Sequence, residues 1–114
     1  MSKFDEAIVQ YKDAMHNKLG LKTINEGLLT SVTKSLGPSI YLKDASRVSC
    51  SDKAERDRVK NNFLIKKLGL MDTPELDKAV EAVCQQFGSD NRSKFRAVFY
   101  YLLVEKMGKQ SMFQ

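Results

Sequence analysis

The sequence predicts an all-α fold, a compact array of five helices in which two similar helical hairpins pack on a hydrophobic C-terminal helix. Apolar residues recur at the i, i+3, i+4 and i+7 spacing of helices, and glycines divide this pattern into helix-length segments. The uncharged run from Ala97 to Val104, AVFYYLLV, would make a helix apolar around nearly its whole circumference. Such a helix is usually buried on more than one side, so we expect it to form the centre of the fold.

Length and composition indicate one ordinary globular domain. The chain has 114 residues, of which 42% are hydrophobic and 29% charged, and we assign all of it, residues 1–114, to a single helical domain. The longest apolar run is far shorter than the ~20 residues that a membrane span needs. Lys3, Asp5 and Glu6 interrupt the N-terminus before a signal-peptide core could form. We therefore expect a cytoplasmic protein that does not cross a membrane.

The first helix begins after Ser2, a suitable N-cap with Asp5 at the third helical position. Its apolar stripe consists of Phe4, Ala7, Ile8, Tyr11, Ala14, Met15 and Leu19. Gly20 is expected to end it in a left-handed conformation.

The second helix is expected to begin at Thr23, because Glu26 stands three residues later and completes a capping box. Gly37-Pro38 ends it, since proline cannot continue a helix. The connection that follows, residues 38–51, is long for a compact domain. It is apolar enough that we expect it to be anchored to the core.

The third helix begins near Ser51 or Asp52 and ends at Leu68. At about 100° per residue, its apolar residues form two arcs, one of Ala54, Leu64, Ile65 and Leu68 and the other of Val59 and Phe63. Four basic residues fall between the arcs: Lys53, Arg56, Lys60 and Lys67. We therefore expect the two apolar arcs of this helix to pack against other helices and the basic residues between them to face solvent.

The fourth helix begins at Thr73, with Pro74 at its first position, and ends at Gly88. Residues 89–91 are expected to cap the fifth helix, which ends at Gly108. The tail, residues 109–114, is expected to fray, although Met112 and Phe113 are apolar enough to dock.

A short sequence repeat supports the two hairpins. Lys18-Leu-Gly-Leu21 recurs as Lys67-Leu-Gly-Leu70, and a threonine and a helix follow each copy. Glycine ends so many helices that two unrelated hairpins would look equally alike.

Candidate ligand or partner residues lie in the long connection and in the third helix. They are Ser39, Tyr41, Asp44, Arg47, Asn61, Asn62 and Lys66. Long connections often carry binding sites, but this one is also suited to be an anchored linker. Asn61 falls within an apolar arc, so its amide should be buried and hydrogen-bonded to residues 38–51; the alternative is a ligand contact.

The basic residues of the third helix are candidates for binding nucleic acid. Lys53, Arg56, Lys60 and Lys67 could follow a phosphate backbone, and the net charge of +5 favours such a partner. Charged helix faces are usually only solvated, and no helix-turn-helix, zinc-finger or RNA-binding signature is present. If these residues are ion-paired with carboxylates in the folded protein, the reason for assigning this function is lost.

Catalytic motifs are absent from the sequence. His16 is the single histidine, so a multi-histidine metal site is excluded. A cysteine–histidine nucleophile would require Cys50 or Cys84 to meet it, and the sequence leaves open whether the two cysteines approach each other. We expect no enzyme activity, no cofactor and no metal.

Two strings, Gly37-Pro-Ser-Ile-Tyr41 and Val59-Lys-Asn-Asn-Phe-Leu-Ile-Lys-Lys-Leu-Gly-Leu70, resemble a bacterial family of small proteins known only as a domain of unknown function. The resemblance extends over nearly the whole chain. It implies a small, all-helical, cytoplasmic protein and no particular functional residue. Our first hypothesis is therefore a non-catalytic binding or protein-interaction module, and the alternative is weak, salt-sensitive binding of nucleic acid. The ligand, the partner and the oligomeric state are not encoded in any motif.

Overall fold

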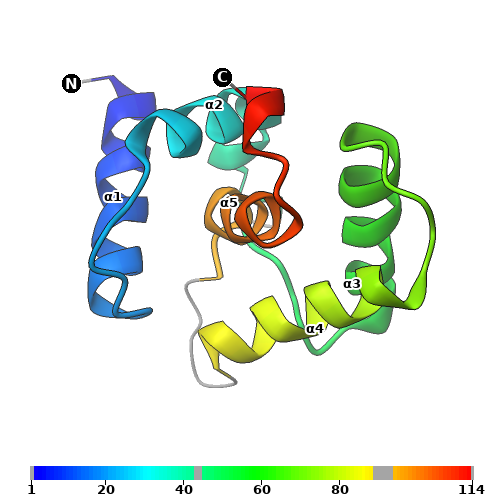
Figure 1. Cartoon of the computed structure of the whole chain (residues 1–114). Helices are drawn as coiled ribbons and strands as arrows, with labels where there is room; N and C mark the ends of the chain where they lie inside the picture. Colours follow the sequence, from blue (N-terminus) through cyan, green and yellow to red (C-terminus); the bar gives the residue numbers. More distant parts are fainter. Residues whose placement is uncertain (1, 43–44, 89–93, 114) are drawn as a thin grey trace.

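The computed structural model describes residues 2–42, 45–88 and 94–113. Its five α-helices are α1 (Lys3–Asn17), α2 (Glu26–Leu36), α3 (Lys53–Val59), α4 (Pro74–Phe87) and α5 (Arg96–Met107). A π-helix, η2 (Lys60–Lys67), continues α3, and two 3₁₀ helices, η1 (Gly37–Tyr41) and η3 (Gln110–Phe113), follow α2 and α5. Figure 1 shows α5 nearly end on, with α1, α2, α3 and α4 arranged around it. The predicted all-α array of five helices is confirmed.

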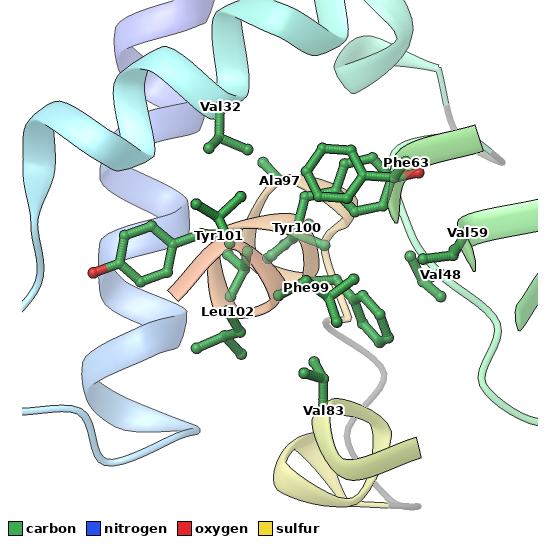
Figure 2. Packing of buried hydrophobic residues seen from close by; sticks show 14 of the residues in the cluster. Val32, Val48, Val59, Phe63, Val83, Ala97, Phe99, Tyr100, Tyr101 and Leu102 are labelled. Atoms are coloured by element: carbon green, nitrogen blue, oxygen red, sulfur yellow. The ribbon is translucent and has the colours of Figure 1, made fainter. Parts of the chain in front are cut away.

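The fold is centred on α5, as its apolar sequence predicts. Every side chain from Ala97 to Val104 is buried. Tyr100 stacks on Phe63 of η2 with ring centroids 3.9 Å apart, and Phe99 stacks on Phe87 of α4 at 5.9 Å. Figure 2 shows side chains from α2, η2 and α4 approaching α5 from different sides. No helix among the described residues is long and apolar enough to cross a membrane.

The start of α2 differs from the expected capping box at Thr23. Asn25 is the N-cap instead, because its side-chain oxygen accepts a hydrogen bond from the Leu28 N–H at 3.1 Å. The Asn25 N–H in turn donates to the Tyr101 hydroxyl of α5 at 2.9 Å. The backbone N–H and the side-chain oxygen of Asn25 are thus both hydrogen-bonded when Asn25 is the N-cap. The helix therefore begins two residues later than the spacing of Thr23 and Glu26 suggests.

The start of α5 is stabilised by a neighbouring segment. The predicted cap at residues 89–91 lies outside the described residues. The Arg96 N–H donates to the Ser46 carbonyl at 2.7 Å, and the Val48 N–H donates to the Lys94 carbonyl at 2.8 Å. The long connection after η1 is therefore held against the N-terminus of α5, which agrees with the anchoring that its apolar residues predict.

The repeated Lys-Leu-Gly-Leu sequence forms the same helix end twice. Gly20 and Gly69 have φ values of +67° and +71°, a conformation that favours glycine. In each copy the N–H of the following leucine, Leu21 or Leu70, donates to the carbonyl six residues earlier, at 3.0 and 3.1 Å. This is the Schellman helix end, so the sequence repeat corresponds to a repeated structure.

The expectation for the third helix, two packed flanks and a buried Asn61, is wrong. The helix becomes a π-helix at Lys60, and i→i+5 hydrogen bonds widen its turns, so residues four and five apart share a face. A single buried face results, made of Val59, Phe63, Leu64 and Leu68. Ala54 and Asn61 are exposed. The prediction failed because it placed the side chains at the 100° per residue of an α-helix along the whole segment.

The C-terminal residues fold back rather than fray. Gln110–Phe113 form η3, and Phe113 packs against the core with its ring 6.5 Å from that of Phe63. Met112 stays exposed. The aromatic side chain offers enough apolar surface to hold the last turn in place.

A disulfide between Cys50 and Cys84 links the long connection to α4. Their Cα atoms are 5.8 Å apart, and 34 residues of sequence separate them. Closing a loop of this length restricts the unfolded chain, which stabilises the folded state.

We predict that replacing both cysteines, Cys50→Ser with Cys84→Ser, lowers the free energy of unfolding by about 3–4 kcal/mol, the loop-closure value for this separation. Urea denaturation of the oxidised protein measures the change. Dithiothreitol should lower the stability of the natural protein by a similar amount and leave the double variant unchanged. Equal stabilities with and without reductant in the natural protein would contradict the prediction.

Candidate functional site

Six of the candidate residues of the sequence analysis lie in two separate grooves. One groove, of about 540 Å³, lies between α3, η2 and α4 and is lined by the basic residues Lys53, Arg56 and Lys60 together with Asn61. The other, of about 420 Å³, lies between α1, η1 and the segment that precedes Val48, and it is lined by Tyr41 and Arg47. We name them the α4 groove and the α1 groove.

The charges of the α4 groove neutralise one another. Carboxylates that line the same groove pair with its three basic residues: Lys53 with Asp57 at 3.2 Å, Arg56 with Glu81 at 3.6 Å, and Lys60 with Asp77 at 3.2 Å and Asp72 at 3.5 Å. The hydrogen bond that the Lys60 ammonium donates to the Asp77 carboxylate helps to raise the pKa of Lys60 above its ordinary value. Three of the four residues proposed to bind nucleic acid, Lys53, Arg56 and Lys60, are therefore ion-paired, which weakens the reason for assigning them to nucleic acid.

The α1 groove has an apolar floor and polar sides. Its floor consists of Ala7, Tyr11, Ile40 and Phe95. The side formed by α1 carries Lys3, Glu6 and Gln10, and the other side carries Tyr41, Ser46 and Arg47. Most of the lining residues are polar, so the groove offers a ligand charged and hydrogen-bonding groups around a small apolar floor, and its volume falls in the range of ligand sites.

The charged side chains of the α1 groove are not neutralised as those of the α4 groove are. Lys3, Glu6 and Arg47 form no ion pair with any part of the chain that the structure describes. The Arg47 guanidinium lies over the Phe95 ring, 5.2 Å from its centroid. In this position the planar group is held by the ring, and its N–H donors remain available for an anion.

Tyr11 is the unusual residue of the α1 groove. Its side chain is 2% exposed, and its ring packs at 5.1 Å against that of Phe95. Within residues 2–42, 45–88 and 94–113, no group forms a hydrogen bond with its hydroxyl, and the hydroxyl is not sealed in the core. Burial, and secondly the nearby Tyr41 hydroxyl, raise the pKa of Tyr11 above its ordinary value of 10.0. A buried hydroxyl is normally paired, so this one is available to a ligand in the groove that it lines.

Arg96 fixes the side of the groove opposite α1. Its guanidinium donates to the Ala45 carbonyl at 2.6 Å and to the Arg47 carbonyl at 3.2 Å. It also donates to the Glu55 carboxylate at 3.1 Å and to the Tyr100 hydroxyl at 3.1 Å. The side chains of Arg96 and Glu55 are only 15% and 14% exposed. A partly buried ion pair thus holds the backbone that carries Arg47.

The other candidates that the structure describes lie outside the α1 groove. The Ser39 hydroxyl donates to the Leu36 carbonyl at 2.8 Å and so completes the end of α2. Asp44 lies outside the described residues. Asn62, Lys66 and Lys67 are exposed on η2, where they converge on no other candidate.

Sequence reasoning missed the α1 side of the groove. Lys3, Glu6 and Gln10 look like ordinary solvated residues of an amphipathic helix, and no local signal distinguishes them. Tyr11 fits the apolar stripe of α1, and its ring is indeed buried. Only the tertiary contact between α1 and the segment near Arg47 shows that its hydroxyl faces a groove.

The potential catalytic residues do not come together. Cys50 and Cys84 are bonded to each other, so neither is a free thiol. His16 Nδ1 lies 2.7 Å from the Leu21 carbonyl, at the end of α1. In the described part of the chain, no three His, Cys, Asp or Glu side chains are grouped as metal ligands would be. The arrangement of the α1 groove is suited to binding.

Comparison with known proteins gives a family without an assigned activity. The family described as "Protein of unknown function (DUF2853)" matches residues 10–111. No curated protein matches the chain.

We predict that Arg96→Lys lowers the free energy of unfolding by about 2–3 kcal/mol, because lysine cannot replace the hydrogen bonds to both carbonyls and to Glu55. Urea denaturation measures the loss. Arg58→Lys is the matched control, since Arg58 also pairs with Glu55, at 3.2 Å, but is 56% exposed. Exposed pairs contribute little, so the control should lose less than about 1 kcal/mol. Equal losses in the two variants would contradict the role given to Arg96.

We predict that Tyr11→Phe changes the free energy of unfolding at neutral pH by less than about 0.5 kcal/mol, because the hydroxyl has no partner to lose. Tyr101→Phe is the control, and it should cost about 1 kcal/mol because it leaves the Asn25 N–H without its acceptor.

The Tyr11→Phe variant also tests the raised pKa of Tyr11. Because the folded pKa exceeds the unfolded value of 10.0, the folded state retains this proton longer, and stability falls as pH rises above about 10. Denaturation at about pH 8 and pH 11 should show a smaller fall in Tyr11→Phe than in the natural protein. An unchanged fall, or a large loss at neutral pH, would contradict the environment assigned to Tyr11.

Proposed function

Because the chain belongs to the DUF2853 family of proteins of unknown function, we propose its function from the chemistry of its own residues. We propose that it is a small, non-catalytic binding module and that its ligand binds in the α1 groove. The single observation that carries this proposal is the hydroxyl of the largely buried Tyr11 side chain, which lines that groove, is not sealed in the core and has no hydrogen-bond partner among the described residues. A folded protein usually satisfies such a group, and a ligand with a hydrogen-bond acceptor would do so.

The rest of the groove supports the same function. Lys3, Glu6 and Arg47 surround an apolar floor without pairing in the described structure, so a ligand gains both apolar contact and charge complementarity. Tyr41 is 48% exposed beside this floor, which is a large exposure for an aromatic side chain in a small domain. A ligand on the floor would cover part of its ring.

Nucleic-acid binding through Lys53, Arg56, Lys60 and Lys67 is the less favoured alternative. A phosphate that approached Lys60 would have to displace the carboxylates of Asp72 and Asp77, which repel it. No observation favours this function over binding in the α1 groove.

We also propose that the protein works in a bacterial cytoplasm. The Cys50–Cys84 disulfide would be reduced in that compartment under ordinary conditions. The groove does not depend on the disulfide directly, because Arg96 and the backbone bonds to the start of α5 hold the Arg47 segment. Binding is therefore expected in both redox states.

We predict that filling the groove abolishes binding. Gln10→Trp places an indole at the groove, whereas Val9→Trp places the same indole on the neighbouring, 49% exposed position that does not line it. Small aromatic and aliphatic fragments should bind the natural protein and Val9→Trp alike, and Gln10→Trp at least roughly tenfold more weakly.

Two-dimensional ¹H–¹⁵N NMR titration measures both affinity and location. The perturbed amides should be those of the groove, from Lys3 to Tyr11 on α1 and near Arg47. Fragments that bind Gln10→Trp as well as the natural protein, or that perturb only amides elsewhere, would contradict the proposed function.

A further inference from the structure

We infer that the ligand of the α1 groove is a small monocarboxylate with a planar apolar body, whose carboxylate pairs with Arg47 and whose second polar group meets the Tyr11 hydroxyl. This inference rests on the proposed function and names the class of ligand that the groove selects.

The charge around the groove favours an anion. Lys3 and Arg47 stand on its two sides and Glu6 is the single carboxylate among its lining residues, so the lining carries one net positive charge. None of the three is neutralised by an ion pair in the described structure. A monoanion balances this charge, whereas a phosphate dianion would be repelled by Glu6.

The geometry of Arg47 favours a carboxylate. Its guanidinium lies over the Phe95 ring, and its carbonyl accepts a hydrogen bond from Arg96, so both its side chain and its backbone are held in place. A guanidinium held by one face presents its N–H groups at its edge, where a planar carboxylate accepts two parallel hydrogen bonds.

The floor and Tyr41 favour a planar apolar body. Ala7 and Ile40 contribute apolar floor, and the exposed Tyr41 ring stands at the side. A flat ligand between α1 and Tyr41 would bury apolar surface and stack on the phenol ring. The Tyr11 hydroxyl then supplies the second polar contact, as a donor, because a tyrosine hydroxyl is protonated at neutral pH.

The experiment compares 4-hydroxybenzoate with its neutral analogue 4-hydroxybenzamide, by ¹H–¹⁵N NMR titration of the full chain. The benzoate should bind the natural protein roughly tenfold more tightly than the amide. Arg47→Gln should remove this difference, and Lys34→Gln, the same charge change on α2 outside the groove lining, should preserve it. Tyr11→Phe should weaken binding of 4-hydroxybenzoate but leave that of benzoate, which lacks the second polar group, unchanged.

The outcomes separate this inference from the proposed function. If neutral fragments bind the groove and the benzoate gains nothing over the amide, or keeps its gain in Arg47→Gln, the ligand class is wrong and the proposed function stands. Tighter binding of phenyl phosphate than of benzoate would likewise overturn the choice of a carboxylate. If neither the acids nor the neutral fragments bind, both the ligand class and the proposed function fail.

Discussion

The Arg96 guanidinium joins three parts of the chain that no regular secondary structure connects. It donates to two carbonyls of the long connection, Ala45 and Arg47, to the Glu55 carboxylate of α3, and to the Tyr100 hydroxyl of its own helix. Because the guanidinium and the carboxylate are both largely buried, removal of Glu55 would leave the Arg96 charge without its ion-pair partner, whereas removal of Arg96 would leave Glu55, among the described residues, paired only with the more exposed Arg58. Together with the backbone hydrogen bonds that join Arg96 to Ser46 and Val48 to Lys94, these contacts hold residues 45–48 of the connection, and with them one side of the α1 groove.

Charged residues are ion-paired in the α4 groove and without ion pairs among the described residues in the α1 groove. In the α4 groove each lysine or arginine has a carboxylate at 3.2 to 3.6 Å. Lys53 pairs within α3, whereas the pairs of Arg56 and Lys60 connect α3 and η2 to α4 and the turn before it. In the α1 groove Lys3, Glu6 and Arg47 remain without ion pairs in the described structure, and a buried tyrosine has no hydrogen-bond partner there. Exposed charges need no partner within the chain, but these can pair with a charged ligand that also bonds to the Tyr11 hydroxyl, so the second groove is the better candidate for binding.

The features that could be predicted from the sequence are those set by neighbouring residues. The apolar run of α5 can be stable only in a core, and the two Lys-Leu-Gly-Leu ends follow from glycine's access to positive φ. The π-helix could not be predicted, because spacings of four and five residues also suit two arcs of an α-helix. That error placed Asn61 inside the molecule. The α1 groove was missed for another reason: Lys3 and Arg47 are distant in sequence and meet only through the tertiary fold.

The disulfide and the groove are separable, and this matters for a protein expected to work in a reducing compartment. Cys50 stands three residues beyond Arg47, and between them the Val48 N–H is bonded to the Lys94 carbonyl. Opening the disulfide therefore releases α4 from the connection without releasing Arg47, whose carbonyl stays bonded to Arg96. Stability and binding then respond to different interactions, since the disulfide acts mainly on the unfolded chain, whereas Arg96 shapes the folded groove.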